Sequence, residues 1–233
     1  MKRKPKLCVA LDVPYERAVK LVRDLFDFFE SYPLVLKVGH LLYAERGGDA
    51  VRELKDAFPY EVFLDLKFHD IPSVVAKAVE KASELGADYA TLHLLGGPEM
   101  VREAVKAKGE RLKLLGVSLL TSHDESYPGY IKSGASLEEL VLHLAREGLR
   151  EGVDGIVCSG RELPLLRKEL GKEFIAVVPG VRVRKDRSDQ KRVISPAEAV
   201  KLGADLVVIG REITQSTNPV YVVERALKLM GVL

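Results

Sequence analysis

Short apolar runs alternate with amphipathic segments along the whole chain, and this alternation constrains the fold more than any other feature. Eight runs are nearly continuously hydrophobic and rich in β-branched residues, which is typical of strands covered on both faces. They lie at residues 7–11, 34–38, 62–66, 89–94, 112–120, 155–158, 174–178 and 206–209. Between them, apolar residues recur at helical spacing, for example over residues 18–29 and 75–85, which predicts helices.

Local signals mark where these helices begin and end. Ser136 with Glu139, and Ser195 with Glu198, form Ser-x-x-Glu pairs that predict capping boxes at two helix starts. A Gly-x-Asp sequence precedes three of the runs, at residues 86–88, 152–154 and 203–205. Glycine just after a helix can adopt the left-handed conformation that ends it. The recurrence indicates a repeated unit of strand and helix.

Repeated units of this kind over 233 residues predict an α/β protein, a (β/α)8 TIM barrel in which residues 1–233 form a single domain. An open, doubly wound parallel sheet is the alternative. No Gly-x-Gly-x-x-Gly sequence follows the first run, which weakens the dinucleotide-binding version of that alternative. No linker-like or low-complexity segment divides the chain.

Charged residues follow the third run in the sequence Asp65-Leu66-Lys67-Phe68-His69-Asp70. Side chains alternate along a strand, so Asp65 and Lys67 are expected to point the same way, with Asp70 just past the strand end. Ionised groups beside a buried strand are costly unless they pair, and a solvated salt-bridge cluster is the plain alternative. The C-terminal strand ends of a barrel meet at one mouth, where its chemistry occurs. Asp12 and Lys37 lie at two further ends, which favours a functional cluster.

The last two strand ends carry glycine and arginine, in Pro179-Gly180-Val181-Arg182 and Ile209-Gly210-Arg211. TIM barrels frequently bind phosphate between the loops that follow these strands. Residues 183–192 form a polar, basic loop that includes Gln190 and is long enough to fold over a bound anion. A solvated basic loop and a nucleic-acid surface are the alternatives, but the loop has no aromatic residue for base stacking. We therefore predict a phosphate clamp.

Composition excludes several classes of protein. The 36 basic and 34 acidic residues leave a formal charge of +2, too small to indicate nucleic acid binding. Cys8 and Cys158 are far apart and lack the spacing of metal ligands or of a disulfide framework. No stretch approaches the roughly 20 apolar residues of a membrane span, and no signal peptide is recognisable, so we expect a cytoplasmic protein. Many charged residues and only three amides, one Asn and two Gln, predict a heat-adapted source.

Taken in order, the motifs resemble the orotidine 5′-monophosphate decarboxylase family. The string Asp65 to Pro72, which reads Asp-x-Lys-x-x-Asp-Ile-Pro, is the specific part. Weaker matches are Val9-Ala10-Leu11-Asp12, Leu36-Lys37-Val38-Gly39, His93 with Gly96-Gly97, Leu120-Thr121-Ser122, Asp189-Gln190-Lys191-Arg192 and the two phosphate-clamp motifs. The resemblance implies a barrel homodimer that converts orotidine monophosphate into uridine monophosphate and carbon dioxide in de novo pyrimidine biosynthesis. It also implies that no metal or organic cofactor takes part.

The resemblance implies a role for each candidate residue. Lys67 would stabilise the carbanion that forms at C6 of the pyrimidine and would then protonate it. Asp65 would lie beside the substrate carboxylate, and Lys37 with Asp70 would complete an alternating charge network. Asp70 would reach the site of the neighbouring subunit. The residues implied in substrate binding are Asp12 and Lys37 at the ribose, Thr121 at the pyrimidine, Arg182, Gln190, Gly210 and Arg211 at the phosphate, and Ile71 and Pro179.

The chain departs from the family pattern after Pro72, where the common Asn-Thr is replaced by Ser73-Val74, and Val74 cannot form the hydrogen bond expected near the ribose. His93 either supports the site or is a structural histidine. One alternative function is that of hexulose-6-phosphate synthase or ketogulonate-6-phosphate decarboxylase, which use magnesium and usually have Ala-Gly in place of Ile71-Pro72. A non-catalytic phosphate-binding barrel is another alternative.

Overall fold

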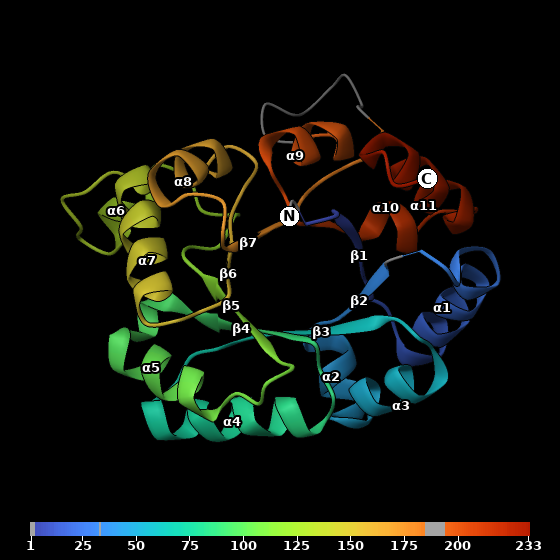
Figure 1. The fold of residues 1–233 in the computed structure, drawn as a ribbon, viewed down its shortest axis with the longest axis horizontal. Coiled ribbons are helices and arrows are strands. Elements are labelled where there is room, and N and C mark those ends of the chain that lie inside the picture. The colour runs from blue at the N-terminus through green and yellow to red at the C-terminus, as the bar shows by residue number, and fades with distance from the viewer. Residues whose placement is uncertain (1–2, 33, 185–193) are drawn as a thin grey trace.

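The strands of a computed structural model, which describes residues 3–32, 34–184 and 194–233, close into a parallel barrel (Figure 1). Each described strand pairs with the next one along the chain, and β8 pairs with β1. The strands are β1 (Lys6–Ala10), β2 (Leu34–Val38), β3 (Glu61–Phe68), β4 (Tyr89–His93), β5 (Lys113–Val117), β6 (Gly155–Val157), β7 (Ile175–Val178) and β8 (Leu206–Ile209). The predicted (β/α)8 barrel is confirmed, and the open sheet is excluded.

Helices form an outer ring around the strands (Figure 1). They are α1 (Tyr15–Phe29), α2 (His40–Arg46), α3 (Asp49–Ala57), α4 (Pro72–Glu84), η1 (Leu94–Gly96), α5 (Pro98–Ala107), α6 (Tyr127–Tyr130), α7 (Leu137–Arg150), α8 (Leu163–Leu170), α9 (Pro196–Leu202), α10 (Arg211–Thr214) and α11 (Pro219–Met230). Both predicted capping boxes are present, with Ser136 beginning α7 and Ser195 beginning α9. The Glu139 and Glu198 side chains accept the reciprocal hydrogen bonds.

Apolar side chains fill the molecule in two layers. Alternate strand residues such as Cys8, Phe63 and Val177 form a buried cluster inside the barrel. Their neighbours, such as Leu7 and Leu36, pack outward against the helices in the larger cluster. This division follows from the two-residue period of a strand, and it explains why the runs are hydrophobic at nearly every position.

Two predicted strands differ from the structure by more than one residue at an end. The fifth run was expected to reach residue 120, but β5 ends at Val117, and residues 118–120 lead out of the sheet. The third strand is longer than expected, because β3 continues into the charged motif as far as Phe68. Its pairing with β4 shifts there: Leu64 pairs with Ala90 and Phe68 with Leu92, so β3 spans four steps where β4 spans two.

The Gly-x-Asp repeat fastens the N-terminal ends of the strands. The glycine of each copy has a positive φ, of 83°, 100° and 98° at Gly86, Gly152 and Gly203. Each aspartate then accepts a hydrogen bond from a backbone N–H of the preceding strand. The pairs are Val62 with Asp88 at 2.7 Å, Leu114 with Asp154 at 2.8 Å, and Ala176 with Asp205 at 2.8 Å. A cation, respectively Lys55, Lys108 or Arg167, pairs with each carboxylate. The repeat therefore joins neighbouring strands to the helix ring.

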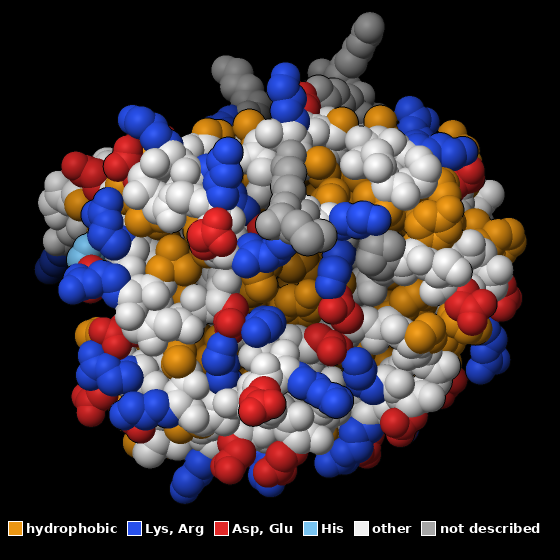
Figure 2. Space-filling model, in the orientation of Figure 1, with side chains coloured by type: hydrophobic (Ala, Val, Ile, Leu, Met, Phe, Trp, Pro, Cys, Tyr) orange, Lys and Arg blue, Asp and Glu red, His pale blue; other side chains and the backbone are white. Residues whose placement is uncertain are grey.

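The face of the molecule shown in Figure 2 carries interspersed charges. Basic and acidic side chains alternate around hydrophobic side chains near the middle of this face. This distribution agrees with the small formal charge of +2. Within the described part of the chain, no helix has the length and apolar character needed to cross a membrane.

We predict that Asp205→Ala lowers the free energy of unfolding by about 3 kcal/mol, because the change leaves the Arg167 guanidinium and the Ala176 N–H without this partner. The Arg167 and Asp205 side chains are only 10% and 15% exposed. Urea unfolding of the two proteins measures the difference. Asp49→Ala is the control, since the Asp49–Arg52 pair is about 60% exposed at both side chains, and removal of such a pair costs at most about 1 kcal/mol. Equal losses in both variants would contradict the prediction.

Candidate active site

Alternating charges line the C-terminal ends of β2 and β3. The Lys37 Nζ atom lies 3.2 Å from Asp12 Oδ1 and 3.3 Å from Asp65 Oδ2. The other oxygen of Asp65, Oδ1, is 2.9 Å from Lys67 Nζ. The carboxylate of Asp65 thus bridges two ammonium groups, and Asp12, just after β1, adds a second carboxylate. We call these four side chains, Asp12, Lys37, Asp65 and Lys67, the charged row. The structure brings together four of the predicted site residues in the expected alternation of sign.

Burial and ion pairing have opposite effects on the pKa values of Lys37 and Asp65. The Lys37 and Asp65 side chains are only 11% and 12% exposed. Burial raises the pKa of Asp65, but the nearby Lys37 and Lys67 outweigh it, and the pKa lies below its ordinary value. Burial likewise lowers the pKa of Lys37, but the carboxylates of Asp65 and Asp12 raise it above its ordinary value. Both groups are therefore charged at neutral pH.

Asp65 and Lys67 contact each other as predicted, but regular strand alternation is not the reason. Lys67 has a φ of 51°, in the left-handed region, and it lies within the register shift between β3 and β4. Its backbone N–H donates a hydrogen bond to Thr91 Oγ1 at 2.9 Å. The Thr91 hydroxyl donates in turn to Asp65 Oδ1 at 3.0 Å. A bulge in β3, supported from β4, thus sets the geometry of this pair.

Gly39 leaves room for the row of charges. A Cβ atom at this position would lie 2.7 Å from Asp12 Oδ1, which is closer than real Cβ atoms pack, and 3.0 Å from Lys37 Nζ, which is a tight contact. The glycine directly follows β2, so the backbone passes beside the Lys37–Asp12 ion pair without displacing it. A side chain here would force the end of the Asp12 side chain to shift.

Two adjoining hollows meet at the charged row. The larger has a volume of about 730 Å³, and its lining includes Asp12, Pro179 and Gly180 with the arginine-bearing ends of β7 and β8. The smaller has a volume of about 200 Å³, and its lining includes Lys67, Thr121 and Ser122 together with apolar side chains. Lys37, Asp65, Pro179 and Val208 line both. The charged row therefore lies between a polar chamber and a smaller, more apolar one.

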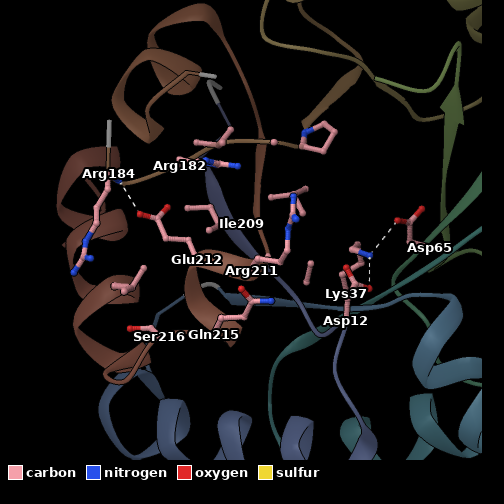
Figure 3. A pocket seen from close by; sticks show the side chains of 17 residues that line it. Asp12, Lys37, Asp65, Arg182, Arg184, Ile209, Arg211, Glu212, Gln215 and Ser216 are labelled. Atoms are coloured by element: carbon pink, nitrogen blue, oxygen red, sulfur yellow. Dashed lines mark hydrogen bonds and ion pairs between the residues drawn. The ribbon is translucent and has the colours of Figure 1, made fainter. Parts of the chain in front are cut away.

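Arginine residues line the larger hollow on the side away from Lys37. Arg182, Gly210 and Arg211 all line it, as does Arg184 (Figure 3). Figure 3 shows the side chain of Arg184 directed away from Lys37, on the far side of Glu212. The Glu212 carboxylate accepts hydrogen bonds from the backbone N–H groups of Val183 and Arg184, at 2.6 and 2.8 Å. It thereby ties the segment after β7 to α10.

Asp70 and Ile71 are predicted site residues that line neither hollow. Asp70 is exposed, and its carboxylate accepts a hydrogen bond from the backbone N–H of Ile71, its own neighbour. Ile71 is 62% exposed. Gln190 lies outside the described residues. Among residues 3–32, 34–184 and 194–233, no three imidazole, thiol or carboxylate groups are arranged to hold a metal ion.

Sequence reasoning missed Thr91 and Glu212. Thr91 lies inside an apolar strand, and nothing in its own sequence shows that its hydroxyl faces the bulge of β3. Glu212 follows Arg211, and nothing in the sequence distinguishes it from an ordinary helix residue. The only signal in the sequence was that Glu212 places a carboxylate beside a predicted anion site. Such a carboxylate needs a hydrogen-bond donor, for example a backbone N–H.

His93 lies beside the row rather than in it. Its ring stacks on that of His69, with centroids 5.3 Å apart. The Nδ1 atom is buried and has no hydrogen-bond partner among the described residues. Burial, helped by the charges of His69, His123 and Lys67, lowers the pKa of His93 to about 4. The ring is therefore neutral at physiological pH.

Comparison with known proteins identifies the family. Residues 5–226 match the model of the "Orotidine 5'-phosphate decarboxylase / HUMPS family". The chain belongs to this family. A protein of Aquifex aeolicus named orotidine 5′-phosphate decarboxylase is 67% identical over 228 residues, which cover 97% of this chain and 98% of that protein. A protein of the same name from Streptococcus pneumoniae is 40% identical, with 94% and 93% covered.

A solved structure agrees with this assignment. The orotidine 5′-phosphate decarboxylase of Lactobacillus acidophilus superposes with a TM-score of 0.83 at 31% identity, and the match covers 97% of this chain and 99% of that one. The resemblance predicted from the motifs is confirmed at the level of the family.

We predict that acidification destabilises the protein through His93. The folded-state pKa of about 4 lies below the unfolded value of about 6.5, so the unfolded chain binds more protons between these values, and stability is lost as the pH falls through this window. His93→Asn should lose less stability than the wild-type protein between pH 7 and pH 4, as measured by urea unfolding. Parallel curves for the two proteins would contradict the prediction.

Proposed function

We infer that this chain is an orotidine 5′-phosphate decarboxylase, which converts orotidine monophosphate into uridine monophosphate and carbon dioxide in pyrimidine biosynthesis. We further propose that Lys67 stabilises and then protonates the carbanion at C6. Family membership supports the activity, and the bridge from Asp65 to both Lys37 and Lys67 is the observation that carries the mechanism. The expected cytoplasmic location and the single-domain organisation stay predictions.

The reaction needs an ammonium group that is fixed in advance. Loss of carbon dioxide leaves an electron pair on C6 in an orbital that the ring carbonyls delocalise poorly. A cation held at that position stabilises the charge without having to reorganise, and the same group can then deliver a proton. Lys67 fits this requirement, because Asp65 holds its Nζ at 2.9 Å beside the smaller hollow.

Asp65 has two effects in this proposal. It positions Lys67, and it places a negative charge near the carboxylate of the bound substrate. Because its pKa is depressed, Asp65 stays ionised at neutral pH. Repulsion between the two carboxylates disfavours the bound substrate and disappears as carbon dioxide departs.

The two hollows suit the two ends of the nucleotide. We propose that the pyrimidine occupies the smaller hollow, next to Lys67 and Thr121, with Pro179 between the two spaces. The ribose then lies against Asp12 and Lys37, and the phosphate reaches Arg182, Gly210 and Arg211 in the larger hollow. Binding energy from the distant phosphate can be used to hold the reacting ring in place. Gln190 belongs to the same proposed set.

We propose a homodimer in which Asp70 and Ile71 serve the partner's site. Within one chain, Asp70 bonds its own neighbour and not Lys67. Ile71 and Val74, beside it, are large apolar side chains that are 62% and 45% exposed, which is typical of a surface that is covered on assembly. Asp70 from a second copy would complete the alternating charges around Lys67.

The activity is tested by following the absorbance of orotidine monophosphate in the presence of EDTA. We predict full activity for the wild-type protein, and a loss of at least about 1,000-fold for Lys67→Ala, since both charge stabilisation and proton delivery are removed. Lys81→Ala is the control, because Lys81 forms an exposed ion pair on α4. Activity that EDTA abolishes would favour a magnesium-dependent reaction instead, and an active Lys67→Ala would refute the assigned role.

The shared site is tested by mixing two inactive variants, Lys67→Ala and Asp70→Ala. If each site takes Lys67 from one chain and Asp70 from the other, a mixed dimer contains one intact site. Random exchange of subunits should then restore about a quarter of the wild-type activity per chain. Size-exclusion chromatography with light scattering checks the assembly. No recovery in a mixture shown to contain mixed dimers would rule out the contribution across the interface.

A further inference from the structure

We propose that Thr91 is a positioning residue for this reaction: its hydroxyl supports the backbone of Lys67 and at the same time aims the Asp65 carboxylate at the Lys67 ammonium. Thr91 lies on β4, on a different strand from the charged motif. The inference rests on the proposed function, because it concerns how the same lysine is held.

The backbone of Lys67 needs support, because it is not regular strand. A φ of 51° lies in the left-handed region that residues with a side chain rarely adopt, and such a conformation persists only where the surroundings hold it. The register shift displaces this part of β3 from its ladder with β4. The Lys67 N–H donates to a side chain instead, Thr91 Oγ1, at 2.9 Å.

The same hydroxyl also reaches the partner of the lysine ammonium. A threonine hydroxyl can donate one hydrogen bond while it accepts others. Here it accepts from the Lys67 N–H and donates to Asp65 Oδ1 at 3.0 Å. That oxygen is the one that lies 2.9 Å from Lys67 Nζ. One hydroxyl therefore links the backbone of Lys67 to the carboxylate that orients its side chain.

Burial makes this hydroxyl hard to replace. Thr91 is fully buried, with 0% of its surface exposed. If the hydroxyl were removed, water would have little access to the Lys67 N–H or to this side of Asp65, and both would lose a hydrogen bond. Asp65 contacts Lys37 on β2, Lys67 on β3 and Thr91 on β4. Of these three partners, Thr91 is the uncharged one.

Two substitutions separate the hydroxyl from its methyl group. Thr91→Val keeps the shape and removes the hydroxyl, and we expect kcat to fall by about 10- to 100-fold while KM changes by less than about threefold. Thr91→Ser keeps the hydroxyl and removes the methyl, and we expect kcat within about threefold of wild type. If Thr91 served only for packing, the order of the two variants would be reversed.

The pH profile gives a second readout. The hydrogen bond from Thr91 is one of the interactions that lower the pKa of Asp65. In Thr91→Val the acidic limb of kcat/KM should therefore move to higher pH, whereas in Thr91→Ser it should stay at the wild-type position. A change in packing alone would lower the melting temperature without moving this limb.

The experiment measures orotidine monophosphate decarboxylation by wild type, Thr91→Val and Thr91→Ser, with circular dichroism to verify folding. An inactive wild-type protein would refute the proposed function, whereas a wild-type rate in folded Thr91→Val would refute only the role of Thr91. Thr91→Ser as slow as Thr91→Val would refute it as well. Should Thr91→Val fail to fold, Thr91→Cys replaces it, because a thiol is a weak hydrogen-bond donor and acceptor. A kcat for Thr91→Cys equal to that of Thr91→Ser would then overturn the proposal.

Discussion

The buried carboxylate of Asp65 is the interaction on which the site depends. It holds Lys37 with one oxygen and Lys67 with the other, and each ion would be costly at this depth without the rest. Gly39 makes room for the row, Thr91 secures it from β4, and the hollows open on either side of it. The position of Lys67 thus depends on residues from β2, β3 and β4, and not on the charged motif alone.

Much of this arrangement could be predicted from the sequence, because the signals are local. The apolar runs and capping boxes depend on the periods of strands and helices, so the order of elements and the starts of α7 and α9 followed from them. Once a barrel was inferred, its strand ends had to meet at one mouth. The cluster of Asp12, Lys37, Asp65 and Lys67 followed from that topology, without any knowledge of distances.

The remaining features depend on contacts that a single sequence does not contain. The bulge in β3 results from its pairing with β4, so the left-handed conformation of Lys67 could not be read from the residues around it. The sequence does not distinguish Thr91 from any other threonine in a strand, because its role depends on its contacts with β3. Glu212 is similar, because its donors, the N–H groups of Val183 and Arg184, belong to a segment almost 30 residues earlier.

The Gly-x-Asp anchors lie at the opposite ends of the strands from the charged row. The contacts that join the strands to the helix ring and the charges that carry the proposed chemistry are therefore made by different residues of one barrel. A substitution at one of these anchors can change the stability of the barrel while the charged row at the other end of the strands stays intact.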